Sequence, residues 1–156
     1  MQGKTVAQSE VVLMRALLPN EANVAGTIHG GYLLLYIDSA AALVAKRHAR
    51  TNVATASLDR MDFLAPMRPG EMLHLKACLH MVGKTSMEVG VRVDVEEITT
   101  GAVRHVASCY MIFVALDSAG KPTPVPPLIL SNDIERERHE KALERKRQRL
   151  IMQAQS

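Results

Sequence analysis

Four consecutive strand-like segments between residues 53 and 116 constrain the fold of this chain most. They cover residues 53–63, 71–82, 87–98 and 104–116, and short turns such as Pro69-Gly70 separate them. The third segment has the clearest period of two, with Val89, Val91, Val93 and Val95 alternating with Gly90, Arg92, Asp94 and Glu96. We expect the valines to be buried and the alternate residues to face water. Four strands joined by short connections predict an antiparallel sheet.

One apolar helix is expected before these strands, over residues 30–49, and a first strand over residues 8–18 precedes it. Leucine, isoleucine and alanine cover almost every face of the helix, so we expect other structure to wrap it. Its last turn holds Lys46, Arg47 and His48, cations that suit the negative end of the helix dipole. A single sheet around a single helix leaves the far side of the helix uncovered, which favours a dimer.

Asp38 is the only charged residue between positions 30 and 45 of that helix. A carboxylate in such surroundings loses hydration, which makes it a stronger base when it is ionised. The paired glycines at 30 and 31 let a ligand approach the free N–H groups of the helix start. An acid and a set of N–H donors are two parts that a hydrolase needs. The structural alternative is that Asp38 faces a water-lined groove or pairs with an arginine.

Composition excludes several other classes of protein. The chain has 156 residues, enough for one domain with a core, and a net charge of +3 that is only +1 over residues 1–130. With so little charge on the body and no aromatic residues among the basic ones, we expect no nucleic-acid partner. No metal-ligand spacing occurs, so we expect no metal, and Cys78 and Cys109 are expected as buried free thiols.

We expect a cytoplasmic protein with no membrane partner. The first residues lack the apolar run of a signal peptide. The apolar run 31–45 falls short of the roughly 20 residues that span a bilayer, and Asp38 interrupts it.

The chain divides into an expected domain over residues 1–130 and a charged segment over residues 131–156. The proline-rich stretch 121–127 between them should be extended and stiff. Asn132 or Ser131 can cap a helix there, with acids leading and bases trailing. Its apolar stripe is sparse and consists of Ile134, Ala142, Leu143, Leu150 and Ile151. A solvated helix or a fraying tail is expected, and a binding role is the alternative.

The segment from Asn23 to Gly31 (Asn-Val-Ala-Gly-Thr-Ile-His-Gly-Gly), followed by Asp38, resembles the hotdog-fold acyl-CoA thioesterases, in particular their cytosolic acyl-CoA hydrolase branch. Segments at 62–66, 70, 83–89 and 120–126 resemble that family in the same order, and the likeness covers about residues 8–128. It implies an α+β hotdog fold, a curved antiparallel sheet wrapped around one long helix, to which the charged C-terminal helix or tail is added.

The resemblance also implies an activity and an assembly. The activity is hydrolysis of fatty acyl-CoA to the free fatty acid and coenzyme A, with no cofactor beyond the coenzyme A of the substrate. Two chains would join sheet edges, and three such dimers would form a homohexamer. Each active site would lie between two chains, with Asn23 and Gly30 of one facing Asp38 of its partner.

The implied chemistry has named candidates. The N–H of Gly30 or Gly31 would polarise the thioester carbonyl, and Asn23 would donate to the same oxygen or hold the attacking water. Asp38 would act as general base on water, or attack directly to form an anhydride. Some related thioesterases carry a hydroxyl residue one helical turn after the acid, where this chain has Ala42, so the means of holding water stays open.

The remaining candidates concern binding. His29 is expected to organise the loop or the helix start, with proton transfer as the alternative. Thr55, Ser57, Arg60 and the turn Gly83, Lys84, Thr85 and Ser86 are candidates to line the pantetheine and nucleotide path. Lys84 would meet a phosphate of coenzyme A or remain solvated.

Two other functions fit the same residues. A hotdog hydratase or dehydratase would use a histidine and an acid on an acyl thioester. A non-catalytic sensor would bind acyl-CoA and respond through the charged tail.

Overall fold

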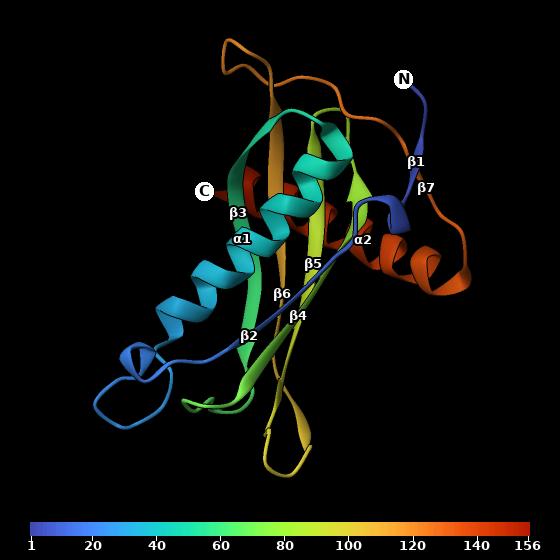
Figure 1. Ribbon diagram of the computed structural model, residues 1–156. Helices are drawn as coiled ribbons and strands as arrows, with labels where there is room; N and C mark the ends of the chain where they lie inside the picture. The colour runs from blue at the N-terminus through green and yellow to red at the C-terminus, as the bar shows by residue number, and fades with distance from the viewer.

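A five-stranded antiparallel sheet carries the fold. The computed structural model describes residues 1–156, and its strands lie in the order β2-β4-β5-β6-β3 (Figure 1). They are β2 (Val11–Ala16), β3 (Asn52–Phe63), β4 (Met72–Val82), β5 (Ser86–Glu96) and β6 (Val103–Leu116). The four strands predicted after the helix are confirmed with small shifts at their ends. β2 is shorter than the predicted 8–18, because 3-10 turns at Val6–Gln8 and Pro19–Glu21 enclose it.

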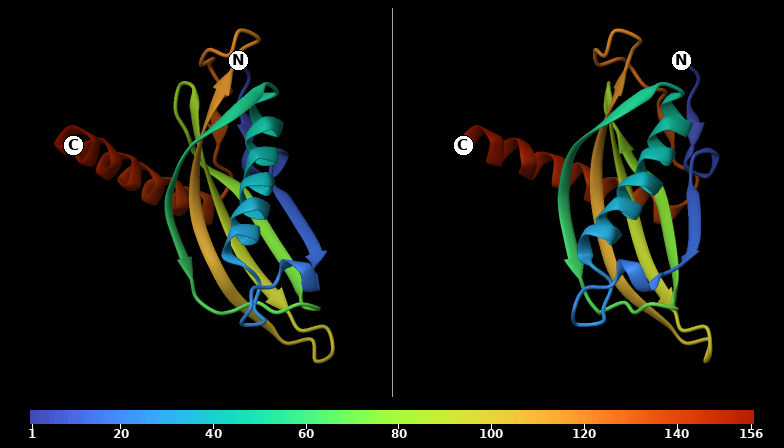
Figure 2. Two further views of the ribbon diagram at one scale, coloured as in Figure 1. Left: turned by 90° about the vertical axis from the view of Figure 1, so that its left-hand side faces the viewer. Right: turned by 60° about the vertical axis from the view of Figure 1, so that its left-hand side comes forward.

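Helix α1 (Gly30–Ala49) lies in the concave face of the sheet, with the predicted bounds (Figure 2). Leu33, Ile37 and Val44 are buried against the strands, and the alanines between them allow a close approach. Arg50 ends the helix in a left-handed conformation, with φ of 56°. α1 therefore holds Asp38 at a fixed height above the sheet.

One side of α1 has no cover within the chain, as the single-sheet arrangement predicts. Leu35 is 55% exposed, and Leu34 and Leu43 are exposed beside it. Strand β3 forms one edge of the sheet, so its outer backbone groups are unpaired. The expectation that other structure wraps the helix holds only for its sheet side within one copy. Exposed apolar side chains beside an open strand edge are typical of a surface that a partner covers.

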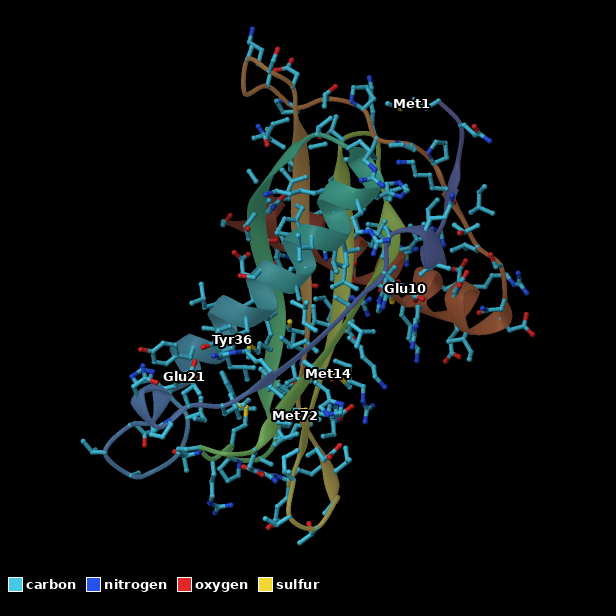
Figure 3. The ribbon with its side chains drawn as sticks, in the orientation of Figure 1. Met1, Glu10, Met14, Glu21, Tyr36 and Met72 are labelled. Atoms are coloured by element: carbon cyan, nitrogen blue, oxygen red, sulfur yellow. The ribbon has the colours of Figure 1, made fainter.

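Arg15 of β2 ties the loop before α1 to the helix. Its Nη1 lies 2.7 Å from Oε2 of the buried Glu21, and its guanidinium carbon lies 4.2 Å above the ring of Tyr36. Figure 3 labels Glu21 before the helix and Tyr36 on it. Burial acts to raise the pKa of Glu21, but the hydrogen bonds from Arg15 and from the N–H of Leu18 outweigh it and lower that pKa. These contacts fix where the loop 22–29 begins.

The proline-rich stretch leads to a short pairing that the sequence did not predict. β1 (Lys4–Thr5) and β7 (Leu128–Ile129) form a two-residue parallel ladder. Beside it, His48 Nε2 lies 2.7 Å from the carbonyl oxygen of Pro126, and Lys4 Nζ donates to the carbonyl oxygen of His48 at 2.7 Å. The end of α1 is thereby joined to both terminal segments.

Helix α2 (Asp133–Gln155) crosses the face of the sheet opposite to α1, and its C-terminal end projects away from the body (Figure 2). Asn132 caps it as predicted, accepting from the N–H of Glu135 at 2.9 Å. The expectation of a solvated helix or a fraying tail is wrong for the sheet-facing side, where Ala142 is buried and Arg145 lies over Tyr110.

Arginines, and not the predicted apolar stripe, make most of this contact. Arg138, Arg145 and Arg149 lie on the helix face that Ala142 shares, and each contacts a strand residue. Ile134, Leu150 and Ile151 of the predicted stripe are exposed instead. The prediction that the alternate residues of β5 face water is confirmed for Arg92, which is exposed, and is wrong for Gly90 and Asp94, which are buried. Glu88, on the same face, is buried where Arg145 of α2 pairs with it.

Candidate active site

Asp38 lies on the side of α1 that faces β3. The hydroxyl of Thr55 donates to Asp38 Oδ1 at 2.8 Å, and Oδ2 makes no hydrogen bond within the chain. No lysine or arginine pairs with Asp38, so the structural alternative of an arginine partner is not found. A carboxylate with one oxygen held and the other free can take a proton from a water molecule in a fixed direction.

Thr55 therefore lies against the acid, although it was a candidate for the pantetheine and nucleotide path. The ladder between β3 and β6 shifts register directly after it, between Thr55 and Ser57, and such bulges re-aim side chains. A hydroxyl from the sheet thus stands next to the acid, whereas the helix position one turn later is Ala42. Sequence reasoning missed this pairing, since the two residues are 17 positions apart and belong to different elements.

The start of α1 holds one free N–H donor. His29 is the N-cap, and its Nδ1 accepts from the N–H of Gly31 at 3.3 Å. This is the organising role expected of His29, and it occupies one of the two predicted N–H donors. The N–H of Gly30 makes no hydrogen bond in the chain, so Gly30 is the available donor of the pair.

Asn23 shapes the loop that precedes the helix. Its Oδ1 accepts from the N–H groups of Ala25 at 3.0 Å and Thr27 at 3.3 Å, and its Nδ2 donates to the Thr27 hydroxyl at 3.1 Å. Gly26 completes the turn with φ of +82°. One hydrogen of the Asn23 amide is left for a ligand. Because Asn23 and Val24 are exposed, the loop is open to a partner or a substrate.

The donor and the acid are too far apart to serve one carbonyl within a single chain. Gly30 and Asp38 are eight residues apart on one helix, which at 1.5 Å per residue separates them by about 12 Å along the axis. A thioester oxygen at Gly30 therefore lies out of reach of water held by Asp38 of the same copy.

An apolar hollow of about 480 Å³ lies next to Gly30. It is lined by residues of the helix start and of the segment after β3, namely Thr27, Ile28, Gly30, Phe63, Leu64, Ala65, Pro66 and Met67. The ring of Phe63 stands over Gly30, at 3.5 Å from the position that a Cβ would take there. The motif at 62–66 was noted in the sequence without a role, and the structure places it beside the free N–H.

The other binding candidates are dispersed. Ser57 is exposed on β3, and the Nε of Arg60 pairs with Asp62 at 3.0 Å. The turn over residues 83–86 joins β4 to β5 at the end of the sheet far from Gly30 (Figure 1). There the carbonyl oxygens of Lys84 and Thr85 accept backbone hydrogen bonds, while the Lys84 side chain is exposed without an ion pair. One chain does not bring this turn to the helix start.

Two further observations concern metals and membranes. No group of three or more His, Cys, Asp or Glu side chains converges in the structure. Neither helix has the length and apolar character required to span a membrane.

Comparison with known proteins gives a family. A model of the thioesterase superfamily matches residues 25–102. An uncharacterised acyl-CoA thioester hydrolase of Bacillus subtilis is 39% identical over 142 residues, which cover 91% of this chain and 83% of that protein. Among solved structures, an apo-hexameric acyl-CoA thioesterase superposes with a TM-score of 0.95 at 38% identity, covering 99% of both chains.

An acyl-CoA hydrolase of Staphylococcus aureus, solved with butyryl coenzyme A and coenzyme A, superposes with a TM-score of 0.90 at 34% identity, covering 97% of this chain and 93% of that one. Variants of that enzyme replace one asparagine, one aspartate and one threonine by alanine. Those three positions are separated by 15 and 17 residues, as are Asn23, Asp38 and Thr55 here. With this agreement of sequence and fold, the chain belongs to the thioesterase superfamily and has its hotdog fold.

Proposed function

We propose that this protein hydrolyses acyl-CoA thioesters to the free acid and coenzyme A, at sites that two copies build together. The observation that carries the proposal is the pair formed by Asp38 and Thr55 on an uncovered face of α1, beside an open strand edge. The matching spacing of Asn23, Asp38 and Thr55 with the three positions altered in the S. aureus acyl-CoA hydrolase supports it.

In the proposed mechanism Asp38 acts as general base. Thr55 holds Oδ1, so Oδ2 removes a proton from water while the water oxygen attacks the thioester carbon. The carbonyl oxygen, which becomes negative, accepts from the free N–H of Gly30 of the other copy and from the Asn23 amide. The tetrahedral intermediate then expels the thiolate of coenzyme A, which takes the proton from Asp38. Thiolate is a good leaving group, so no further acid is required.

Substrate placement follows from the hollow beside Gly30. Its apolar walls, which include Phe63 and Met67, suit the uncharged part of the substrate on one side of the carbonyl. No cofactor enters this mechanism beyond the coenzyme A of the substrate. Lys84, exposed and unpaired on its turn, stays a candidate for a phosphate of coenzyme A from another copy.

The assembly we propose is a homohexamer of three edge-joined dimers. The unpaired edge of β3 and the exposed leucines of α1 supply a surface for the dimer, and a solved structure that is 38% identical is described as hexameric. Within the dimer, each Asp38 would face the Gly30 of the other chain. A cytoplasmic location is part of the same proposal.

Hydration of an enoyl thioester is less well supported. Such a reaction needs a histidine next to the acid, but Nδ1 of His29 accepts from Gly31 at the helix start. Incubation with a 2-enoyl-CoA should release thiol without prior hydration of the double bond.

The first test uses Asp38→Asn, which keeps the size of the side chain. We expect thiol release from acyl-CoA to fall by at least about 100-fold, the scale of a positioned acid–base group. Light scattering should give the same particle mass as for the unchanged protein. Near-normal turnover in this variant would refute the role of Asp38. An assay over short, medium and long acyl chains would then define the preferred substrate.

The second test asks whether two chains share a site. We would mix equal amounts of the Asp38→Asn and Asn23→Ala variants, unfold the mixture and refold it. If each site takes Asp38 from one chain and Asn23 from the other, random pairing restores about a quarter of the full activity, because half of the dimers hold one intact site. If one chain supplied both residues, the mixture would be no more active than the separate variants.

A further inference from the structure

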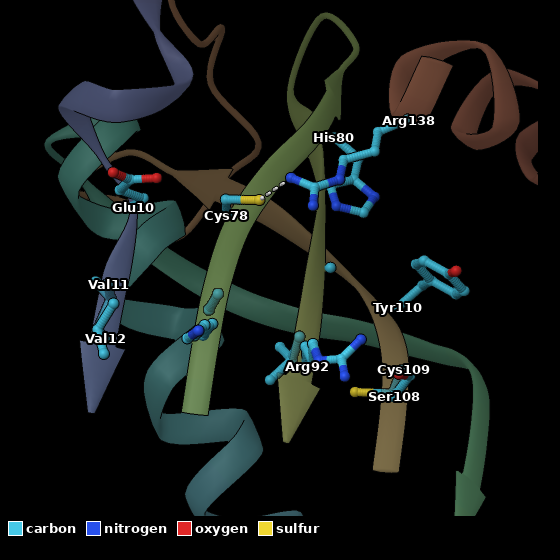
Figure 4. Close-up of a pocket in the computed structure, with 14 residues that line it drawn as sticks. Glu10, Val11, Val12, Cys78, His80, Arg92, Ser108, Cys109, Tyr110 and Arg138 are labelled. Atoms are coloured by element: carbon cyan, nitrogen blue, oxygen red, sulfur yellow. Dashed lines mark hydrogen bonds between the residues drawn. The ribbon is translucent and has the colours of Figure 1, made fainter. Parts of the chain in front are cut away.

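A second hollow lies on the face of the sheet opposite to α1, under the first turns of α2. Its volume is about 390 Å³, and strands β2, β4, β5 and β6 form its floor. Polar side chains line it from both the sheet and the helix, chiefly Lys76, Cys78, His80, Arg92, Tyr110 and Arg138 (Figure 4). Because the sheet separates it from Asp38, the mechanism above makes no use of these side chains.

Arg138 differs from the other arginines of its helix face. Arg145 and Arg149 each pair with a carboxylate of the sheet, at 2.7 and 3.0 Å. Arg138 instead points its Nη1 at the Cys78 sulfur, 3.7 Å away, and pairs with no carboxylate (Figure 4). Burial raises the pKa of the Cys78 thiol, which leaves it an uncharged neighbour. Arg138 therefore brings a positive charge that no ion pair holds to the rim of the hollow.

The other charged side chains of the hollow differ in whether they form ion pairs. Lys76 forms no ion pair, and Arg92 is balanced by Asp94, whose Oδ2 lies 3.1 Å from the Arg92 Nε. Glu10 is the acidic residue of the lining. Glu135, close to Cys78 on α2, is engaged by the N–H of Ser131 at 2.7 Å. Lys76 and Arg138 are thus the two cations of the hollow without an ion pair, and Glu10 and Glu135 are the carboxylates near them.

His80 adds a polar group without a partner. Its Nδ1 is buried and makes no hydrogen bond, and the ring occupies space that Gly90 leaves open, since a Cβ there would lie 2.2 Å from it. Burial, with the charges of Arg138 and Arg145, lowers the pKa of His80 to about 4. The ring is then neutral at pH 7, with one nitrogen that donates and one that accepts. Buried polar groups normally find partners, so this unpaired atom points to a ligand.

We propose that this hollow binds a small organic molecule that carries a phosphate group, separately from the thioester site. The phosphate would take charge-assisted hydrogen bonds from Arg138 and Lys76, and its three free oxygens also suit an imidazole donor. The exposed side chain of Val12 on β2 would contact the uncharged part of the ligand. The volume lies within the range of small-molecule sites, so the ligand is larger than phosphate itself. Since α2 supplies Arg138, binding would also fasten this helix to the sheet.

Phenyl phosphate is a suitable probe, because it joins a phosphomonoester to a small apolar body. It would be titrated by calorimetry into the full-length protein saturated with coenzyme A, so that the substrate site is filled. We expect saturable binding that Arg138→Gln and Lys76→Gln each weaken at least about tenfold, as expected for the loss of a charge-assisted bond. Arg147→Gln is the control, because it removes the same charge from an exposed position of α2. Phenylacetate, a carboxylate of similar size, should bind more weakly.

Three results would overturn the proposal. These are an absence of saturable binding, equal affinities for Arg138→Gln and the Arg147→Gln control, and tighter binding of phenylacetate. Kinetic assays of thiol release from acyl-CoA distinguish this hollow from the thioester site. If Arg138→Gln raised the KM for acyl-CoA, the hollow would belong to the substrate site and would not be separate. If circular dichroism showed that Arg138→Gln fails to fold, the affinity of Lys76→Gln for phenyl phosphate would test the proposal in its place.

Discussion

The contact between α2 and the sheet depends on a buried carboxylate, and removing its partner should destabilise the protein strongly. Glu88 of β5 has no exposed surface. Arg145 places its Nε 2.8 Å and its Nη2 2.7 Å from Oε1, while Oε2 has only Arg149 at 3.9 Å. The guanidinium also lies 3.6 Å above the ring of Tyr110. Arg145→Met keeps the aliphatic stem and leaves Glu88 buried without its main partner.

We expect this variant to lose about 3 kcal/mol in the free energy of unfolding at pH 7. Loss of one partner of a buried ion pair typically costs about 3–5 kcal/mol. We expect the lower end of this range, because Arg149 remains near Glu88 and because Glu88 can bind a proton. Burial already raises the pKa of Glu88 against the opposing effect of Arg145, and the variant would raise it further.

The dependence on pH provides an internal check. A carboxyl group whose pKa is raised by folding binds protons more tightly in the folded state, so its burial is less costly as the pH falls towards that pKa. The deficit of Arg145→Met should therefore shrink between pH 7 and pH 5, by at most about 1.4 kcal/mol per pH unit. A loss that grew on acidification would contradict the assigned cause.

Urea unfolding followed by far-ultraviolet circular dichroism is the assay, since the chain has no tryptophan. Protein concentration is held constant, because an oligomer gains stability with concentration. Arg147→Met, at an exposed site of the same helix, should change stability by less than about 0.5 kcal/mol. The double variant Glu88→Leu with Arg145→Met should recover most of the loss, since both charges are then absent. A loss below about 1 kcal/mol in Arg145→Met would refute the claim that this pair holds α2.

Other consequences are open to measurement. Folding lowers the pKa of His80 to about 4, so the unfolded chain binds a proton at His80 more readily than the folded chain does. The stability that neutral His80 gives above pH 6.5 is therefore lost as the pH falls towards 4. At pH 5 this loss amounts to about 2 kcal/mol in the free energy of unfolding. Urea unfolding of His80→Gln should show a correspondingly smaller loss between pH 7 and pH 5, and equal losses would contradict the assignment. Thr55→Val removes the donor to Asp38 and should lower kcat about 10-fold or more with little change in KM, whereas Thr55→Ser should keep most of kcat. An equal fall for the valine and serine variants would show that the hydroxyl is not the active feature.

Local patterns account for most of the fold. The ends of α1 agree with the prediction because glycines and His29 mark its start and three basic residues its end. The role of α2 was missed for a physical reason. A binary pattern counts arginine as a surface residue, but Arg145 and Arg149 lie with their long stems against the sheet and pair with its acids Glu88 and Asp59. Glu88 and Gly90, on the supposedly wet side of β5, were the available signal, since glycine on an exposed strand face has no side chain to contribute.

Some features of the candidate site can be read from neighbouring residues in the sequence, and others depend on contacts between distant residues. Asp38 stands out in the sequence because it is alone in an apolar helix, and its distance of about 12 Å from Gly30 follows from the helix geometry alone. The separation from which we propose a site shared by two chains is thus contained in the sequence spacing. The contact between Asp38 and Thr55 cannot be read from the spacing, because it depends on which strand passes α1 and on a register shift beside Thr55. Strand pairing over long sequence distances sets that contact, so only the folded chain reveals which hydroxyl holds the acid.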